Sequence, residues 1–267
     1  MGEFNNKTVF ITGAAKGQGR AVALAFAKEG ADIAAFDLGE KISYPSYNRA
    51  SGKDLDDLKK EIESLGVKCA VFAGDVRNFK DVENAVSGAV KEFGKIDILF
   101  NNAGVAAYGY SWELTQEEWS AVIDINLTGA WLVGKYVIPQ MIKQNYGVII
   151  NNSSVGGLRG FNRLSHYCAS KWGMTGLTKS WAIELVKYNI RVLSIHPTGV
   201  NTPFNDGLAE LEGKTREEVA QASAGNLQPV AWIEPEDVAN SVLFLASDKA
   251  GRVTGSQFVL DAGLLTK

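Results

Sequence analysis

A glycine-rich turn near the N-terminus is the strongest constraint on how this chain can fold. The turn, T-G-A-A-K-G-Q-G at residues 12–19, follows an apolar β-rich run at 7–12 and precedes a helical pattern at 18–29. Its three glycines allow a tight turn and let backbone N–H groups approach a pyrophosphate at the helix N-terminus. Such a turn can also serve only to pack a helix closely on a sheet. The strand–turn–helix–strand context favours a dinucleotide site.

The rest of the chain repeats the alternation of strand and helix. Apolar runs predict further strands at 32–37, 68–73, 97–101, 148–151, 191–196 and 258–260. Helical spacing of apolar residues predicts further helices at 54–65, 82–93, 115–143, 167–188 and 235–246. This pattern predicts an α/β chain, a single-domain Rossmann fold with a doubly wound seven-stranded parallel sheet and helices on both faces. A (β/α)₈ barrel is disfavoured, because seven strands are counted and the first turn is glycine-rich.

Two segments interrupt this rhythm. The connection 38–53 has sixteen residues, whereas connections in α/β units usually have about 2–6. Residues from about 200 to 232 form a second excursion before the last helix. Loops of this length are commonly functional. We therefore expect one dinucleotide-binding domain over 1–267, with an insertion at 38–53 and a substrate lid at about 200–232.

The small numbers of cysteines and histidines limit the chemistry that this chain can perform. The 267 residues include two cysteines and two histidines, so neither a disulfide framework nor a metal site is expected. Lys and Arg number 27 against 30 Asp and Glu, without a basic run, which argues against nucleic acid or a membrane as partner. No apolar stretch approaches the ~20 residues of a membrane span, and no signal-peptide core precedes the first strand. We expect a cytoplasmic protein.

A carboxylate at the end of the second strand bears on the choice of dinucleotide. Asp37 lies about twenty residues after the glycines, where a carboxylate binds the adenosine ribose hydroxyls and repels a 2′-phosphate. Lys16 acts in the opposite direction, because a cation beside the phosphate turn would attract a 2′-phosphate. Asp37 is expected to lie closer to the 2′ position, so NAD is favoured over NADP.

A tyrosine and a lysine four residues apart supply candidate acid–base chemistry. Tyr167 and Lys171 fall on one face of the helix predicted at 167–188. The ordinary pKa of tyrosine, about 10, is too high for base work at neutral pH, and an adjacent ammonium group would lower it. Ser154, just past a strand, supplies a hydroxyl that could orient a substrate oxygen. A Tyr-x-x-x-Lys pair taken alone is better explained as a surface contact.

Together these motifs resemble the short-chain dehydrogenase/reductase family over essentially the whole chain. The family's T-G-x-x-x-G-x-G matches residues 12–19, and its N-N-A-G matches 101–104. The resemblance implies the catalytic residues Asn126, Ser154, Tyr167 and Lys171. The resemblance also implies a set of residues that bind the cofactor, to which the preceding argument adds Asp37 and Lys16. The full set is Gly13, Lys16, Gly17, Gln18, Gly19, Asp37, Asp75, Val76, Asn102, Ala103, Gly104, Tyr167, Lys171, Pro197, Val200 and Thr202.

The resemblance also implies a role for each catalytic residue. Tyr167 would exchange a proton with the substrate oxygen, and Lys171 would lower the pKa of Tyr167 and hold the nicotinamide ribose. Ser154 would hydrogen-bond the reacting carbonyl, and Asn126 would anchor a water in a proton relay. A hydride would pass between the nicotinamide and the substrate carbon. The implied activity is the NAD-dependent interconversion of a secondary alcohol and its ketone.

One departure from the family pattern points to a subgroup. The family usually has Pro-Gly after the sixth strand, but residues 196–202 read H-P-T-G-V-N-T, so Thr198 replaces a glycine beside the nicotinamide. With the insertion at 38–53, this is similar to carveol-dehydrogenase-like members, and the motifs also resemble those of hydroxysteroid dehydrogenases. Some members of the former keep NAD tightly bound and use another electron acceptor, which is an alternative to free exchange. The family further implies a homotetramer built on helices 115–143 and 167–188.

Three loops after strand ends are expected to form the substrate walls. These are 105–112, 155–165 and the lid from 204 to 232. The first two carry the apolar or aromatic residues Tyr108, Tyr110, Trp112, Leu158, Phe161 and Leu164. With few charges, the loops predict a small hydrophobic substrate, an uncharged cyclic alcohol or ketone of steroid (bile-acid included) or terpenoid type. The same side chains could instead only pack the lid.

Other residues are given accessory or structural roles. Tyr44, Pro45 and Tyr47 in the insertion are expected to fold over the adenosine. His166 is adjacent to the catalytic tyrosine, so on a helix it points to a different face, and we expect it to be structural. A packing role is likewise expected for His196 at the end of a strand.

Other functions are compatible with this fold. A non-catalytic nucleotide sensor would not need the four catalytic residues together, so their joint presence disfavours it. A lyase or isomerase would need only the tyrosine and the lysine and would show no net cofactor turnover. An NADP-dependent ketoreductase of the same family is the alternative within the oxidoreductases.

Overall fold

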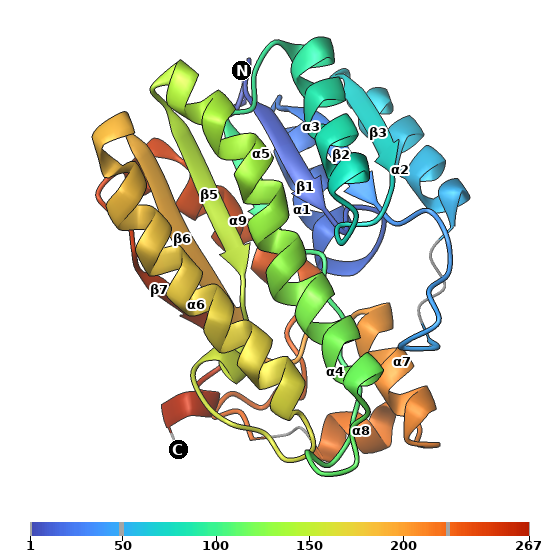
Figure 1. Cartoon of the computed structure of the whole chain (residues 1–267). Helices are drawn as coiled ribbons and strands as arrows, with labels where there is room; N and C mark the ends of the chain where they lie inside the picture. The colour runs from blue at the N-terminus through green and yellow to red at the C-terminus, as the bar shows by residue number, and fades with distance from the viewer. Residues whose placement is uncertain (1, 48–50, 223–224, 267) are drawn as a thin grey trace.

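The computed structural model describes residues 2–47, 51–222 and 225–266, and its centre is a parallel sheet with the strand order β3-β2-β1-β4-β5-β6-β7 (Figure 1). The strands are β1 (Thr8–Thr12), β2 (Asp32–Asp37), β3 (Cys69–Ala73), β4 (Ile98–Asn101), β5 (Gly147–Asn152), β6 (Ile190–Pro197) and β7 (Gln257–Leu260). The α-helices are α1 (Gly17–Lys28), α2 (Gly52–Ser64), α3 (Phe79–Phe93), α4 (Gln116–Ile123), α5 (Gly129–Gln144), α6 (Ser165–Leu185), α7 (Pro203–Leu211), α8 (Arg216–Ala222) and α9 (Pro235–Ala246). The doubly wound seven-stranded parallel sheet expected from the sequence is confirmed.

Helices cover both faces of this sheet because its central strands are apolar on both sides. In β1, Val9 and Ile11 face a buried cluster that includes residues of α1, α2 and α9. Phe10, between them, faces a second cluster with α3, α5 and α6, the helices in front of the sheet in Figure 1. Alternate side chains of a strand point to opposite faces, so a continuous apolar run fits a sheet buried between two helical layers.

The direction in which the chain crosses the sheet changes between β1 and β4. β1 pairs with β2 on one side and with β4 on the other. The chain first adds β2 and β3 outward and then returns to add β4 through β7 in the opposite direction. The loops that follow β1 and β4 therefore diverge and leave a crevice at the carboxyl ends of the strands, where such sheets bind ligands.

The helix predicted at 115–143 contains a π-helical turn that the sequence pattern did not reveal. The capping box at its start is present, with reciprocal hydrogen bonds between Thr115 and Glu118. Residues Asp124–Thr128 then form the π-turn that joins α4 to α5. Such turns are frequent at functional sites, and this one contains Asn126.

The excursion after β6 contains two helices, α7 and α8, that were not predicted. Pro203 lies in the first turn of α7, a position that suits its fixed φ and missing N–H. Before α8, the backbone N–H of Thr215 donates to Glu218 (2.8 Å) and that of Glu218 donates to Thr215 (3.2 Å). This Thr-x-x-Glu pattern is a capping box, and in the sequence it predicts the start of a helix at this position. Parts of the expected insertion (48–50) and lid (223–224) lie outside the described residues.

One helical stretch, Gln116–Gln144, is long and apolar enough to cross a membrane by length and composition. Half of its most apolar window is buried inside the protein. Val133, Val137 and Met141 are fully buried and belong to the cluster on one face of the sheet. The apolarity of this stretch is thus explained by its packing as a core helix.

Candidate active site

A cavity of about 1010 Å³ opens over the crevice at the carboxyl ends of the strands. Ser154, Tyr167, Lys171 and the predicted cofactor-binding residues line it, with one exception. The exception is Gly19, which is buried behind the turn, where a Cβ would overlap the carbonyl of Gly13. Residues from distant parts of the chain therefore meet around one space large enough for a dinucleotide and a small substrate.

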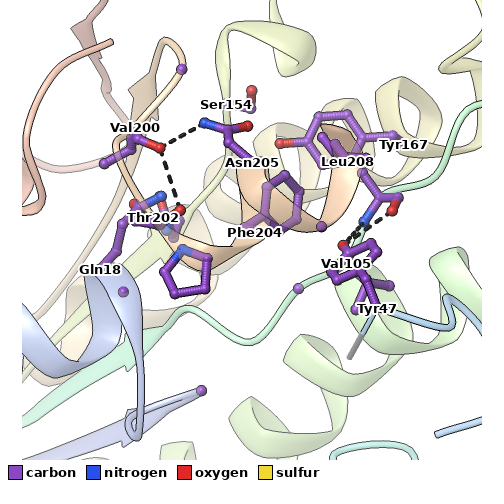
Figure 2. Close-up of a pocket in the computed structure, with 18 of the residues that line it drawn as sticks. Gln18, Tyr47, Val105, Ser154, Tyr167, Val200, Thr202, Phe204, Asn205 and Leu208 are labelled. Atoms are coloured by element: carbon purple, nitrogen blue, oxygen red, sulfur yellow. Dashed lines mark hydrogen bonds between the residues drawn. The ribbon is translucent and has the colours of Figure 1, made fainter. Parts of the chain in front are cut away.

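The predicted catalytic residues Ser154 and Tyr167 lie next to each other. Ser154 follows β5, and its Oγ accepts a hydrogen bond from the N–H of Gly156 at 3.0 Å, which opens a short 3₁₀ turn. Tyr167, in the first turn of α6, has its ring close to Ser154 (Figure 2). Burial raises the pKa of Tyr167 to about 12, although the Ser154 hydroxyl acts in the opposite direction. The phenol expected to exchange a proton thus lies beside the hydroxyl expected to hold a substrate oxygen.

Lys171 lies one helical turn after the tyrosine. Its Nζ donates to the backbone carbonyl of Asn152 at 2.7 Å and lies 5.7 Å from the centre of the Tyr167 ring. The side chain is only 5% exposed, and burial lowers the pKa of Lys171 to about 8. The carbonyl of Asn152 fixes the amine near the tyrosine.

Asn126, on the π-turn, lies behind the cavity wall. Its Oδ1 accepts from the N–H of Val105 at 2.8 Å, and its Nδ2 donates to the carbonyl of Val105 (2.9 Å) and to Ser170 Oγ (3.0 Å). Both amide hydrogens are therefore used by the protein. The side chain holds the loop after Gly104 against α6, so the expected water would have to bind the backbone rather than the amide group.

The glycine-rich turn fits a diphosphate. Gly13 and Gly17 have positive φ angles of +63° and +52°, which L-residues rarely adopt. A Cβ on Gly17 would lie 3.1 Å from the Thr202 side chain, and one on Gly13 would lie 3.0 Å from Ala103. The turn is thus a shallow backbone cradle at the N-terminus of α1, where side chains would fill the space an anion needs.

Two carboxylates line the end of the cavity near β2 and β3. Asp37 accepts hydrogen bonds from the N–H groups of Ala15 (2.8 Å) and Leu38 (2.7 Å), and burial raises its pKa. Asp75, after β3, forms an ion pair with Arg77. Lys16 Nζ lies 3.1 Å from a carboxylate oxygen of Asp54 on α2.

The segment after β6 borders the other end of the cavity. Thr202 Oγ1 donates to the carbonyl of Val200 at 3.3 Å, and Asn205 Nδ2 donates to the same carbonyl at 2.6 Å (Figure 2). Thr198, which stands where the family has glycine, donates from Oγ1 to Asn226 Oδ1 at 3.2 Å. Its hydroxyl thus ties the end of β6 to the lid.

The insertion reaches the substrate end of the cavity. Tyr47 donates from its hydroxyl to the carbonyl of Ala106 at 3.1 Å, and a Cβ on Gly207 in α7 would overlap its ring. The ring of Phe204 lies 6.2 Å from the ring of Tyr47 and 6.4 Å from that of Tyr167 (Figure 2). The expected position of Tyr47 over the adenosine is therefore wrong, because α7 provides a closer apolar surface for it.

The expected substrate walls are partly corrected. Tyr108, Phe161 and Leu164 line the cavity. Trp112 is 79% exposed and stacks on Tyr110 at 4.9 Å, so this pair lies on the surface instead.

The rim of the cavity also carries more charge than the loops suggested. Arg163 forms two hydrogen bonds with Glu212, at 2.8 and 3.0 Å, and Arg159 is exposed beside them. Both arginines and the glutamate line the cavity. The expectation of few charges therefore holds near Tyr167 but is wrong at the rim.

Both histidines are fully buried, and one has more than a packing role. Nδ1 of His196 lies 2.8 Å from the carbonyl of Ser154, and its Nε2 lies 2.8 Å from Ser194 Oγ. The imidazole therefore fixes the backbone of Ser154, a contact between residues 42 positions apart that the sequence pattern did not indicate. His166 does not line the cavity in the described part of the chain.

Comparisons with known proteins agree with this architecture. A family model described as enoyl-(acyl carrier protein) reductase matches residues 13–265. The chain is 39% identical to (-)-trans-carveol dehydrogenase of Rhodococcus erythropolis, covering 100% of both chains. It is 37% identical to cyclohexanol dehydrogenase of an Acinetobacter species, covering 99% of this chain and 97% of the relative. The crystal structure of carveol dehydrogenase from Mycobacterium avium in complex with NAD superposes over 100% of both chains, with a TM-score of 0.95 and 35% identity.

Proposed function

Because this chain belongs to the short-chain dehydrogenase/reductase family, we propose that it is an NAD-dependent oxidoreductase that interconverts a cyclic hydrophobic secondary alcohol and its ketone. The observation that carries the proposal is the position of Ser154, Tyr167 and Lys171. They lie between a backbone cradle suited to a diphosphate and an apolar pocket under α7. The two named relatives act on carveol and cyclohexanol, both cyclic alcohols.

The catalytic residues divide the reaction between them. Ser154 hydrogen-bonds the oxygen of the alcohol and aligns it with the hydroxyl of Tyr167. Tyr167, as phenolate, takes the proton from that oxygen during oxidation and returns it during reduction. The ammonium group of Lys171 stabilises the phenolate and, held by Asn152, holds the nicotinamide ribose. When bound, NAD⁺ supplies the acceptor for the hydride that leaves the alcohol carbon.

The charges at the adenosine end support NAD over NADP. Asp37 offers carboxylate oxygens to ribose hydroxyls at the end of β2. Lys16, the cation expected to favour a 2′-phosphate, is paired with Asp54. A 2′-phosphate would thus meet one carboxylate directly and a lysine already partly neutralised by another, so NADP binding would cost electrostatic energy.

The proposed substrate is a ring compound such as a terpenoid or steroid alcohol. Phe204, Leu208 and Tyr47 form an apolar wall of the cavity next to Tyr167 (Figure 2). Flat apolar rings bury well against such a wall. The charged rim carried by Arg163 and Glu212 leaves room for polar substituents far from the reacting carbon.

A substrate screen tests this function. NADH formation should be measured with carveol, cyclohexanol, a hydroxysteroid and a short linear alcohol, each with NAD⁺ and with NADP⁺. We expect the cyclic alcohols to be oxidised fastest, and with NAD⁺. Faster turnover of the linear alcohol would contradict the substrate class, and a preference for NADP⁺ would contradict the cofactor. If bound NAD does not exchange, the cyclic alcohol should instead reduce an artificial electron-acceptor dye.

We also propose that the protein acts in the cytoplasm as a homotetramer. Its two cysteines, Cys69 and Cys168, are buried and unpaired, as suits a reducing compartment. The outer faces of α5 and α6 carry large exposed apolar side chains, among them Trp131 (45% exposed), Trp172 (50%) and Ile183 (78%). Large apolar side chains exposed on the faces of two neighbouring helices favour an interface.

Replacing Ile183 with aspartate should disrupt this assembly. Light scattering after gel filtration should show four chains for the wild type and fewer for Ile183→Asp, because a carboxylate would be buried without a partner. Leu65→Asp, at another exposed apolar position at the end of α2, is the matched control and should stay tetrameric. A monomeric wild type would contradict the proposal.

A further inference from the structure

Three side-chain amides from different parts of the chain form a hydrogen-bonded series at the floor of the cavity. Asn102 Nδ2 donates to the carbonyls of Thr12 and Gly13, each at 3.0 Å. Asn152 Nδ2 donates to Asn102 Oδ1 and to Gln18 Oε1, each at 2.9 Å. All three amides line the cavity. The series links the turn after β1, the end of β5 and the first turn of α1.

The direction of every hydrogen bond in this series follows from its first member. The carbonyls of Thr12 and Gly13 can only accept, so Asn102 must present its Nδ2 to them and its Oδ1 to Asn152. Asn152 must then present its Nδ2, whose second hydrogen goes to Gln18. Gln18 therefore accepts with Oε1, and its Nε2 is directed away from the series.

The hydrogen bond from Asn152 thus fixes the orientation of the Gln18 amide, and leaves its Nε2 as a donor for which the described residues offer no acceptor. No residue in the described part of the chain accepts a hydrogen bond from Gln18 Nε2, and Gln18 lines the cavity at the start of α1 (Figure 2). Two N–H donors directed into a cavity that adjoins a helix N-terminus suit an oxygen acceptor of a ligand.

The same series leaves one of its own atoms unsatisfied. Asn152 Oδ1 is buried and has no hydrogen-bond partner among the described residues. An apolar pair at positions 18 and 152 would avoid this loss, because partly satisfied buried polar networks are costly to stability. The cost indicates that the series serves binding rather than packing.

We propose that the side chain of Gln18, oriented by Asn152, donates a hydrogen bond to bound NAD. The acceptor is an oxygen in the nicotinamide half, of the adjoining phosphate or of the carboxamide. Asp37, at the adenosine end, is on β2, and Asn152 is on β5, three strand positions away and thus roughly 14 Å distant. Gln18 extends from the diphosphate cradle toward β5 and therefore away from the adenosine. This inference rests on the proposed NAD-dependent function and adds a side-chain contact to it.

Two substitutions of Gln18 separate a donor from a purely structural amide. Gln18→Met keeps the shape but neither donates nor accepts, whereas Gln18→Glu keeps an acceptor for Asn152 but cannot donate. A donor to the cofactor predicts that Gln18→Met weakens NAD binding about 3–10-fold, the loss expected for one hydrogen bond, and that Gln18→Glu weakens it more by repelling the phosphate. A purely structural acceptor predicts instead that Gln18→Met lowers only the melting temperature without ligand and leaves the affinity for NAD unchanged.

Binding should be measured calorimetrically on the full chain with NAD, ADP-ribose and ADP, beside the melting temperature without ligand. Equal losses for all three ligands identify a phosphate oxygen as acceptor, and a loss for NAD alone identifies the carboxamide. Asn152→Leu, which leaves Gln18 unoriented, should reproduce the pattern of Gln18→Met. Unchanged affinity of Gln18→Met for all three ligands would overturn the inference. Failure of the wild type to bind NAD would instead overturn the proposed function.

Discussion

Replacing Tyr167 with phenylalanine is expected to lower kcat/KM for the oxidation of a cyclic alcohol by about 10³-fold, in the range typical of a lost general acid–base. The ring would keep its place beside Phe204, because only the hydroxyl is removed. The substrate oxygen would keep its hydrogen bond to Ser154 but would have no group to take its proton. The loss should therefore appear mainly in kcat, with NAD affinity within a few-fold of the wild type.

Tyr47→Phe is the matched control for this variant. It removes a phenol hydroxyl from the same wall of the cavity, one that is hydrogen-bonded to Ala106 and not to Ser154. Steady-state rates of the two variants, with NAD binding measured calorimetrically, should differ by two orders of magnitude or more. Activity of Tyr167→Phe close to that of Tyr47→Phe would show that another group performs the proton transfer.

The parts of the site that the sequence predicted are those set by local order along the chain. Asp37 ends a strand, and Tyr167 and Lys171 are one helical turn apart, so strand and helix geometry alone place them. The doubly wound parallel sheet followed in the same way, because parallel strands joined by helices allow few arrangements. Spacing and periodicity were sufficient for these features.

The parts that the sequence did not predict depend on contacts between distant segments. The hydrogen bond between Gln18 and Asn152 joins residues 134 positions apart. His196 supports Ser154 only because β5 and β6 are paired side by side. The position of Tyr47 in the chain suggested that it covers the adenosine. In the structure its ring instead packs against Gly207 of α7, where a Cβ would leave no room for it. Such packing is a tertiary property that periodicity does not contain.

Replacing Lys171 with methionine is expected to lower kcat/KM at neutral pH by about 10²–10³-fold. The substitution removes the cation 5.7 Å from the Tyr167 ring and the hydrogen bond to the carbonyl of Asn152. Lys179→Met is the matched control, since Lys179 is an exposed lysine on the same helix whose one hydrogen bond within the described residues goes to the carbonyl of Gly255. The control should retain activity close to that of the wild type.

The pH dependence of oxidation should distinguish a loss of tyrosine activation from a loss of structure. Burial lowers the pKa of Lys171 to about 8 and raises that of Tyr167 to about 12. Lys171 has the lower pKa and loses its proton first, so above about pH 8 the growth of the phenolate is offset by the loss of the ammonium group that stabilises it. In Lys171→Met the first proton to leave is that of Tyr167, near its raised pKa. Because oxidation needs the phenolate, wild-type kcat/KM should level off above about pH 8, whereas that of the variant should keep rising to the highest pH measured. Parallel profiles would mean that Lys171 holds the cofactor without activating the tyrosine.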